Sequence, residues 1–93
     1  MSELSEVTRV GAVTVTADGM VEVRRDTFIM RGPEIVAGPR YHRHVLAPGD
    51  DLANEAAHVR RIAEAAWTPD VVAAHRARAE VDERAAARAG AIT

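Results

Sequence analysis

The chain has 93 residues, which is enough for one small domain and too few for two independent hydrophobic cores. It is 47% hydrophobic and 28% charged and has no apolar run of the roughly 18–20 residues that cross a bilayer, so we expect a globular chain. A formal net charge of −2 gives no broad basic field for nucleic acid or anionic membranes, and the lack of cysteine excludes disulfides, thiolate zinc sites and cysteine nucleophiles.

The apolar residues are mostly valine and alanine, with one phenylalanine, one tyrosine and one tryptophan. Burial stabilises a fold by roughly 25 cal/mol per Å² of apolar surface, so small side chains contribute little each. The core of a lone chain is therefore expected to be thin. Because small domains with thin cores commonly gain stability by association, we expect a homo-oligomer or a place in a larger assembly.

The N-terminal part of the chain predicts a β-hairpin. Residues 1–6 show no periodicity and are expected to form a flexible leader. Residues 7–16 are rich in β-branched side chains, and this strand character resumes over residues 20–31 after the turn residues 17–19. A two-residue loop would mix apolar and charged side chains on one face, whereas a three-residue loop gives one apolar face. The three-residue loop predicts the pairs Val15–Val21, Val13–Val23 and Val7–Ile29.

A third strand is predicted over residues 35–46, after a turn at residues 31–34. Gly38-Pro39 interrupts this strand, and such a pair is expected at a β-bulge or on an edge strand. The three strands together predict an antiparallel meander.

Two helices are predicted after the sheet. Asp50 and Asp51 carry carboxylates that suit a helix start, and apolar residues then recur at three- and four-residue steps over residues 52–67. Thr68 is a cap and Pro69 a first helical residue, so a second helix is expected over residues 69–89, ending at Gly90.

The second helix has few large apolar residues, and the stretch from residue 76 to residue 88 is alanine and charge. This composition is typical of a solvated face or of a helix that lies against a neighbour. Two i,i+4 ion pairs are expected on it, Glu80–Arg84 and Arg78–Asp82. The fold class is thus predicted to be α+β, a three-stranded antiparallel β-meander followed by two α-helices. Residues 7–93 are expected to form one domain with a partly exposed C-terminal helix.

Tyr41-His42-Arg43-His44 is the densest cluster of functional side chains. Alternation places His42 and His44 on one face of the third strand, where two imidazoles can bind one metal ion. A third ligand would have to come from Asp50, Asp51 or His58, and no spacing motif demands it. The alternative is a partly exposed polar face on an edge strand. We predict no metal site and no cofactor, and whether the two histidines sense pH stays open.

Catalysis is not expected, so we predict no catalytic residues and no small-molecule substrate. Ser2 and Ser5 lie in the leader without a rigidly placed base, and the adjacent acids Asp50 and Asp51 suit a cap better than acid–base chemistry. Four arginines on the predicted sheet can gather into a patch: Arg24, Arg25, Arg40 and Arg43. The near-neutral charge and the single tyrosine argue against nucleic acid as a partner, and no membrane partner is expected.

The segment Tyr41-His-Arg-His-Val-Leu-Ala-Pro-Gly-Asp-Asp51, followed by a short helix and by Trp67-Thr-Pro69, resembles short proteins encoded in the tail-gene clusters of tailed bacteriophages and prophages. The likeness covers roughly residues 21–75. The chain departs from that family at Gly38-Pro39 and in its longer Ala/Arg C-terminus. The family has no catalytic motif to carry over.

The resemblance implies a non-enzymatic structural or adaptor subunit of a phage or phage-derived particle, associated with the tail or a tail fibre. Such a protein is made in the bacterial cytoplasm and located in the virion. The alternative is a small phage-encoded protein associated with nucleic acid.

Self-association is expected because an exposed third strand presents unpaired backbone groups, and because the second helix has too few large apolar residues for its own core. The expected partners are copies of the chain, with a trimer as one form, and other virion proteins. The expected contact residues lie on the third strand and the second helix, and are Tyr41, His42, Arg43, His44, Arg76, Glu80, Arg84 and Arg88.

Overall fold

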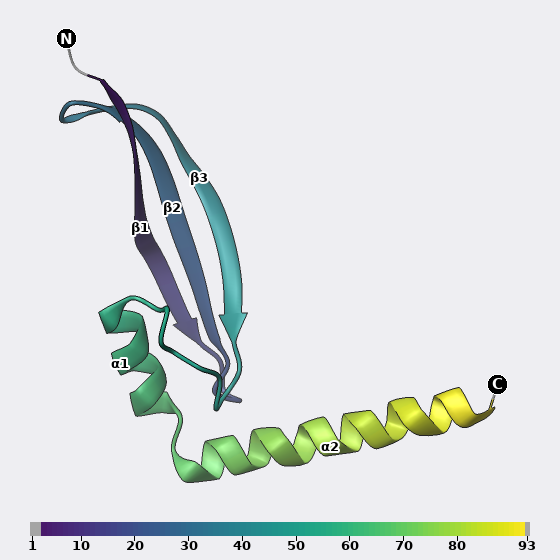
Figure 1. Cartoon of the computed structure of the whole chain (residues 1–93). Coiled ribbons are helices and arrows are strands. Elements are labelled where there is room, and N and C mark those ends of the chain that lie inside the picture. Colours follow the sequence, from purple (N-terminus) through teal and green to yellow (C-terminus); the bar gives the residue numbers. More distant parts are fainter. Residues whose placement is uncertain (1–2, 93) are drawn as a thin grey trace.

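The computed structural model describes residues 3–92 and shows a three-stranded antiparallel sheet followed by two helices (Figure 1). This confirms the predicted α+β meander. The chain order is β1 (Leu4–Val15), β2 (Val21–Arg31), β3 (Glu34–Leu46), α1 (Ala57–Ala66) and α2 (Pro69–Ile92). The molecule measures 64 × 36 × 21 Å, because the strands are long and α2 projects from one end of the sheet (Figure 1).

The hairpin between β1 and β2 has the predicted three-residue loop. The Thr16 amide donates to the Met20 carbonyl at 2.9 Å, and Gly19 takes the left-handed conformation with φ +87°. The pairs Val15–Val21 and Val13–Val23 are confirmed, but Val7 lies opposite Phe28 and not opposite Ile29. The reason is an extra residue, Gly11, which forms a β-bulge between Val10 and Ala12.

Strand β1 begins at Leu4, so the prediction of a flexible leader is wrong for residues 4–6. These residues lie opposite Arg31, Met30 and Ile29 in the β1–β2 register. Strand pairing is made by backbone groups, and β2 extends far enough to pair with residues whose side chains show no periodicity. Met1 and Ser2, which belong to the same predicted leader, lie outside the described residues.

Strand β3 follows a two-residue turn in which Gly32 has φ +58° and Pro33 follows it. This order of a positive-φ glycine before a residue with negative φ suits a type II′ hairpin turn. The predicted irregularity at Gly38-Pro39 is confirmed, because the β2–β3 register shifts between Thr27 and Ile29. The strand order β1-β2-β3 leaves β1 and β3 as the two edges of the sheet.

The core lies between one face of the sheet and α1. Its members are small, as the composition predicts: Val21, Val23 and Leu46 from the sheet, and Val59 and Ala63 from α1. Only six hydrophobic residues within 3–90 are buried, the sixth being Phe28 on the other face of the sheet. The expectation of a thin core is therefore confirmed for this part of the chain.

Helix α1 begins at Ala57, five residues later than predicted. The carboxylates of Asp50 and Asp51 do not cap it, because they accept hydrogen bonds from the backbone amides of Ala47 (2.8 Å) and Ala53 (2.9 Å) in the preceding turns. Ala56 is the N-cap residue and makes no side-chain cap bond. Residues 47–56 connect the end of β3 to α1, which packs on one face of the sheet.

Helix α2 begins as predicted, with Thr68 Oγ1 accepting from the Val71 amide at 3.3 Å and Pro69 as the first helical residue. It continues through Gly90, where it was expected to stop, because a glycine in a helix costs only about 1 kcal/mol relative to alanine. Val71 lies near Gly19 in the first hairpin loop, while residues 76–90 are all exposed. Within residues 3–92 no helix combines the length and the hydropathy needed to span a membrane.

Candidate functional site

The four residues Tyr41–His44 do not form one surface. Strand alternation places Tyr41 and Arg43 on one face of β3, and His42 and His44 on the face that packs against α1. The prediction that the two histidines share a face is confirmed, and their ring centroids are 6.4 Å apart. The proposed contact residues of β3 are therefore divided between the two faces of the sheet.

His44 connects β3 to the segment before α1. Its Nε2 lies 2.7 Å from Glu55 Oε1, and the two side chains are only 27% and 17% exposed. A groove of about 410 Å³ lies between this segment and the sheet and is lined in part by Arg25 and His58. In the part of the chain that the structure describes, no three His, Asp or Glu side chains are grouped as metal ligands would be.

The other face of the sheet, which we call the open face, is defined by Arg24, Asp26 and Phe28 of β2 and by their neighbours in the register. Asp26 is only 4% exposed. Its carboxylate accepts two hydrogen bonds from Arg24, Nε to Oδ1 at 2.8 Å and Nη2 to Oδ2 at 3.1 Å. The hydrogen bonds to Asp26 favour the charged guanidinium and raise the pKa of Arg24 above its ordinary value.

The bulge at Gly11 makes room for this ion pair. A side chain at position 11 would place its Cβ on the Asp26 carboxylate, so only a residue without a Cβ leaves the site open. The Asp26 carboxylate thus lies next to both the bulge in β1 and the Arg24 guanidinium.

Two aromatic rings carry arginines on the open face. The Arg24 and Arg43 guanidinium carbons lie 4.7 Å and 5.7 Å from the centroid of the Tyr41 ring. The Arg9 guanidinium carbon lies 4.9 Å from the centroid of the Phe28 ring. These distances are typical of cation–π contacts. We call Arg9, Arg24 and Arg43 the arginine cluster.

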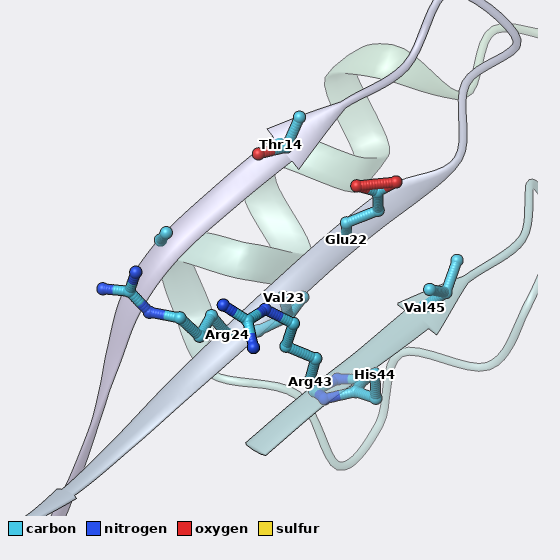
Figure 2. A pocket seen from close by; sticks show the side chains of 8 residues that line it. Thr14, Glu22, Val23, Arg24, Arg43, His44 and Val45 are labelled. Carbon is cyan, nitrogen blue, oxygen red and sulfur yellow. The ribbon is translucent and has the colours of Figure 1, made fainter. Parts of the chain in front are cut away.

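A shallow hollow of about 280 Å³ lies at one end of this cluster. Figure 2 shows the side chains that line it. Arg24 and Arg43 extend along it, and Glu22 and Thr14 lie toward its other end (Figure 2). Guanidinium groups stay protonated and carry only donors, so Arg24 and Arg43 can bind a carboxylate or a phosphate in this hollow.

The four arginines expected to gather on the sheet are divided in the same way as the β3 segment. Arg24 and Arg43 lie directly opposite each other on the open face, whereas Arg25 and Arg40 belong to the face that α1 covers in part. Arg40 forms an exposed ion pair with Glu6 at 3.7 Å. The prediction of one patch from these four residues is therefore wrong.

The predicted contact residues of α2 are remote from those of β3, because the helix leads away from the sheet (Figure 1). All four are exposed, and they are Arg76, Glu80, Arg84 and Arg88. The two expected i,i+4 pairs do not form ion pairs within 4.0 Å in the described chain. Long side chains on a fully exposed helix gain little from such pairs.

Sequence reasoning missed Asp26, Arg9, Phe28 and Glu55. One signal for Asp26 was available, since residues two apart in a strand share a face and Arg24 precedes Asp26 by two. An isolated glycine in a strand, here Gly11, is a second signal, because it indicates a bulge or a close approach of another group. In comparisons with known proteins, the chain matches no protein-family model, no curated protein and no solved structure.

Proposed function

We propose that the chain is a non-enzymatic structural or adaptor subunit of a phage or phage-derived particle, associated with the tail or a tail fibre. The observation that carries the proposal is the distribution of apolar surface. Eight large hydrophobic side chains among the described residues are 42–59% exposed, more than the six hydrophobic residues that are buried. A surface of this kind suits a protein that completes its packing against neighbours.

The exposed apolar side chains lie mainly on the edges of the sheet. Seven of the eight belong to the edge strands: Leu4, Val7 and Val15 on β1, and Ile35, Val36, Tyr41 and Val45 on β3. Edge strands also present unpaired backbone groups, which natural proteins usually protect. We therefore place the main contacts between copies at these edges, where pairing extends the sheet and buries the apolar side chains together.

A closed ring of copies leaves no free edge, which favours symmetric self-association over an open chain of subunits. Three-fold symmetry is the form that the resemblance to phage tail proteins suggests. In such a ring the exposed α2 helices are free to contact each other or other virion proteins through their alternating arginine and acidic side chains.

Two residues of the segments that resemble tail-cluster proteins, Pro48 and Trp67, lie at one structural joint. Trp67 Nε1 donates to the Gly19 carbonyl at 2.7 Å, and Pro48 and Val71 both lie beside Gly19. This joint connects the hairpin loop, the end of β3 and the start of α2.

Mass spectrometry of particles purified from the source organism tests the proposal. The chain should remain with the particles through gradient purification and nuclease treatment, at a constant ratio to a known tail protein. A chain found only in the soluble part of the lysate, while tail proteins are recovered with the particles, would contradict the proposed role.

The arginine cluster supports one alternative, a small phage-encoded protein that binds nucleic acid. Three phosphate contacts would make the logarithm of the binding constant fall with log salt concentration with a slope of about −3. Submicromolar binding to duplex DNA with this salt dependence would favour the alternative. Binding that stays weak even at low salt would favour the structural role.

A further inference from the structure

Neither helix covers the open face. Helix α1 packs on the opposite face, where Val59 and Ala63 contact Val21 and Val23, and it lies behind the strands in Figure 2. Helix α2 leaves the end of the sheet and contributes nothing to the open face (Figure 1). Exposed apolar side chains flank the arginine cluster on this face, namely Val7 and Val45.

The strand register places the three arginines at neighbouring positions of the open face. Arg43 lies directly opposite Arg24, and Arg9 lies directly opposite Asp26, the next residue but one along β2. Neighbouring strands are about 4.8 Å apart. The cluster therefore spans all three strands, at the positions of Arg24 and Asp26, which follow each other on the open face.

Two arginines of this cluster, Arg9 and Arg43, have no carboxylate partner among the described residues. Asp26 is paired with Arg24 alone. Arg9 and Arg43 are exposed and form no ion pair with any residue in 3–92, and their only polar contacts are with the Phe28 and Tyr41 rings. Asp26 already balances the charge of Arg24, so Arg9 and Arg43 are the groups of the cluster that favour an anion from outside the chain.

The cluster is also held in position before any ligand binds. Asp26, buried at the Gly11 bulge, holds Arg24 by two hydrogen bonds, and Tyr41 lies within cation–π distance of both Arg24 and Arg43. Fixing side chains in advance reduces the entropy that binding would otherwise lose. Arginines that serve only as solvated surface residues do not need to be fixed in position in this way.

We propose that the open face binds an acidic segment of a neighbouring protein, with Arg9 and Arg43 binding carboxylates on either side of the fixed Arg24. This deepens the structural role proposed above and rests on it, because the neighbour is taken to be another protein of the particle. Arginine and carboxylate can form paired, charge-assisted hydrogen bonds, and Val7 and Val45 offer apolar contact beside them.

Two observations favour an acidic protein segment over nucleic acid. Phe28 is only 8% exposed and Arg9 lies over its ring, so this ring is not open for base stacking, and the exposed Tyr41 ring already has Arg24 and Arg43 against it. Glu22 lines the same hollow as Arg24 and Arg43. A continuous phosphate chain would meet this carboxylate, whereas a peptide with spaced acidic residues can avoid it.

The test is an NMR titration of the ¹⁵N-labelled full chain with an acetylated and amidated ten-residue polyglutamate peptide. The Nε–Hε signals of Arg9 and Arg43 should shift together with backbone amides of the open face, and a polyglutamine peptide of equal length should shift none of them. Arg9→Gln and Arg43→Gln should each weaken binding about fivefold to tenfold, as expected for the loss of one charge-assisted contact.

Arg25→Gln is the matched control, because Arg25 follows Arg24 in β2, is exposed and lies on the opposite face with the same charge. It should change the affinity by less than about twofold, because a charge on the opposite face acts on the peptide only through screened long-range attraction. Equal weakening by Arg25→Gln, or shifts confined to the arginines of α2, would overturn the proposal. Tighter binding of a ten-nucleotide oligothymidylate at the same arginines would overturn it in favour of nucleic acid.

The particle analysis keeps this proposal separate from the proposed function. If the chain is present in purified particles but polyglutamate does not shift the open face, the docking proposal alone is wrong. If polyglutamate binds as expected but the chain is absent from particles, the acidic-segment site stands and the particle role fails.

Discussion

Gly11→Ala is expected to destabilise the fold strongly even though residue 11 is exposed. The added Cβ would overlap the Asp26 carboxylate, lying only 2.6 Å from Oδ1 and closer still to Oδ2. Asp26 is buried and bonded to Arg24, so it has no free space to move into without losing that partner. Either the β1 backbone shifts away or the carboxylate leaves its site.

The magnitude follows from these two routes. Forcing an extra carbon into a packed site costs about 1–3 kcal/mol, and losing hydrogen bonds to a buried charged group costs about 1.5–3 kcal/mol. Because either route relieves the overlap, we expect a loss of about 1–3 kcal/mol in the free energy of unfolding, a large share of the roughly 5–15 kcal/mol typical of a domain.

Urea unfolding measures this loss, with the fluorescence of Trp67 and far-UV circular dichroism as independent probes. In an Asp26→Ala background Gly11→Ala should cost less than about 0.5 kcal/mol, because the clash is gone and Gly11 is not among the glycines with positive φ. Gly90→Ala is a second control, since a Cβ there meets nothing within 4 Å. Additive costs for Gly11→Ala and Asp26→Ala would refute the reasoning, because they would show that the two residues do not compete for one space.

Three further predictions concern the joints between elements. Trp67→Phe removes the hydrogen bond to the Gly19 carbonyl and should lower the free energy of unfolding by about 1 kcal/mol in urea unfolding followed by circular dichroism; no change would mean that the bond is not formed in solution. A double-mutant cycle with His44→Ala and Glu55→Gln should give a coupling of about 0.5–1.5 kcal/mol from the 2.7 Å contact, and strictly additive losses would count against it. Truncation after His75 should remove helical circular dichroism yet change the free energy of unfolding by less than about 0.5 kcal/mol, because residues 76–90 are exposed; a loss of the sheet's NMR signals would contradict this.

The features that the sequence predicted correctly depend on residues that are neighbours in the chain. The first hairpin loop follows from Gly19 and the pairing it permits, and the start of α2 follows from Thr68 and Pro69. In both places the residue that makes the structure and the group it bonds are within four positions of each other, so a local pattern contains the necessary information.

The features that were predicted wrongly depend on distant partners. The register beyond Gly11 changes because Asp26, fifteen positions later, occupies the space of the missing side chain. The start of α1 was placed too early because Asp50 and Asp51 bond to turn amides instead of the helix. Both carboxylates do accept hydrogen bonds from free backbone amides, as the pattern predicts. The path of the chain around the end of the sheet brings turn amides to them instead of the first amides of α1.

The candidate site was predicted in part. The β3 segment was identified by its dense polar residues, and the shared face of His42 and His44 followed from alternation. The role of Tyr41 and Arg43 was not foreseen, because it depends on Arg24, which contacts the Tyr41 ring from the neighbouring strand. Cross-strand contacts of this kind need the register between β2 and its neighbours, and in β1 that register depends on the unpredicted bulge at Gly11.

Sedimentation velocity of the purified full chain tests most directly the claim that its packing is completed by neighbours. The account predicts species heavier than one chain whose proportion rises with concentration from the low micromolar to the submillimolar range. Val45→Thr, at an exposed position of edge strand β3, should shift this equilibrium toward the monomer without loss of the folded circular dichroism spectrum. A single species with the mass of one chain at every concentration would contradict the account.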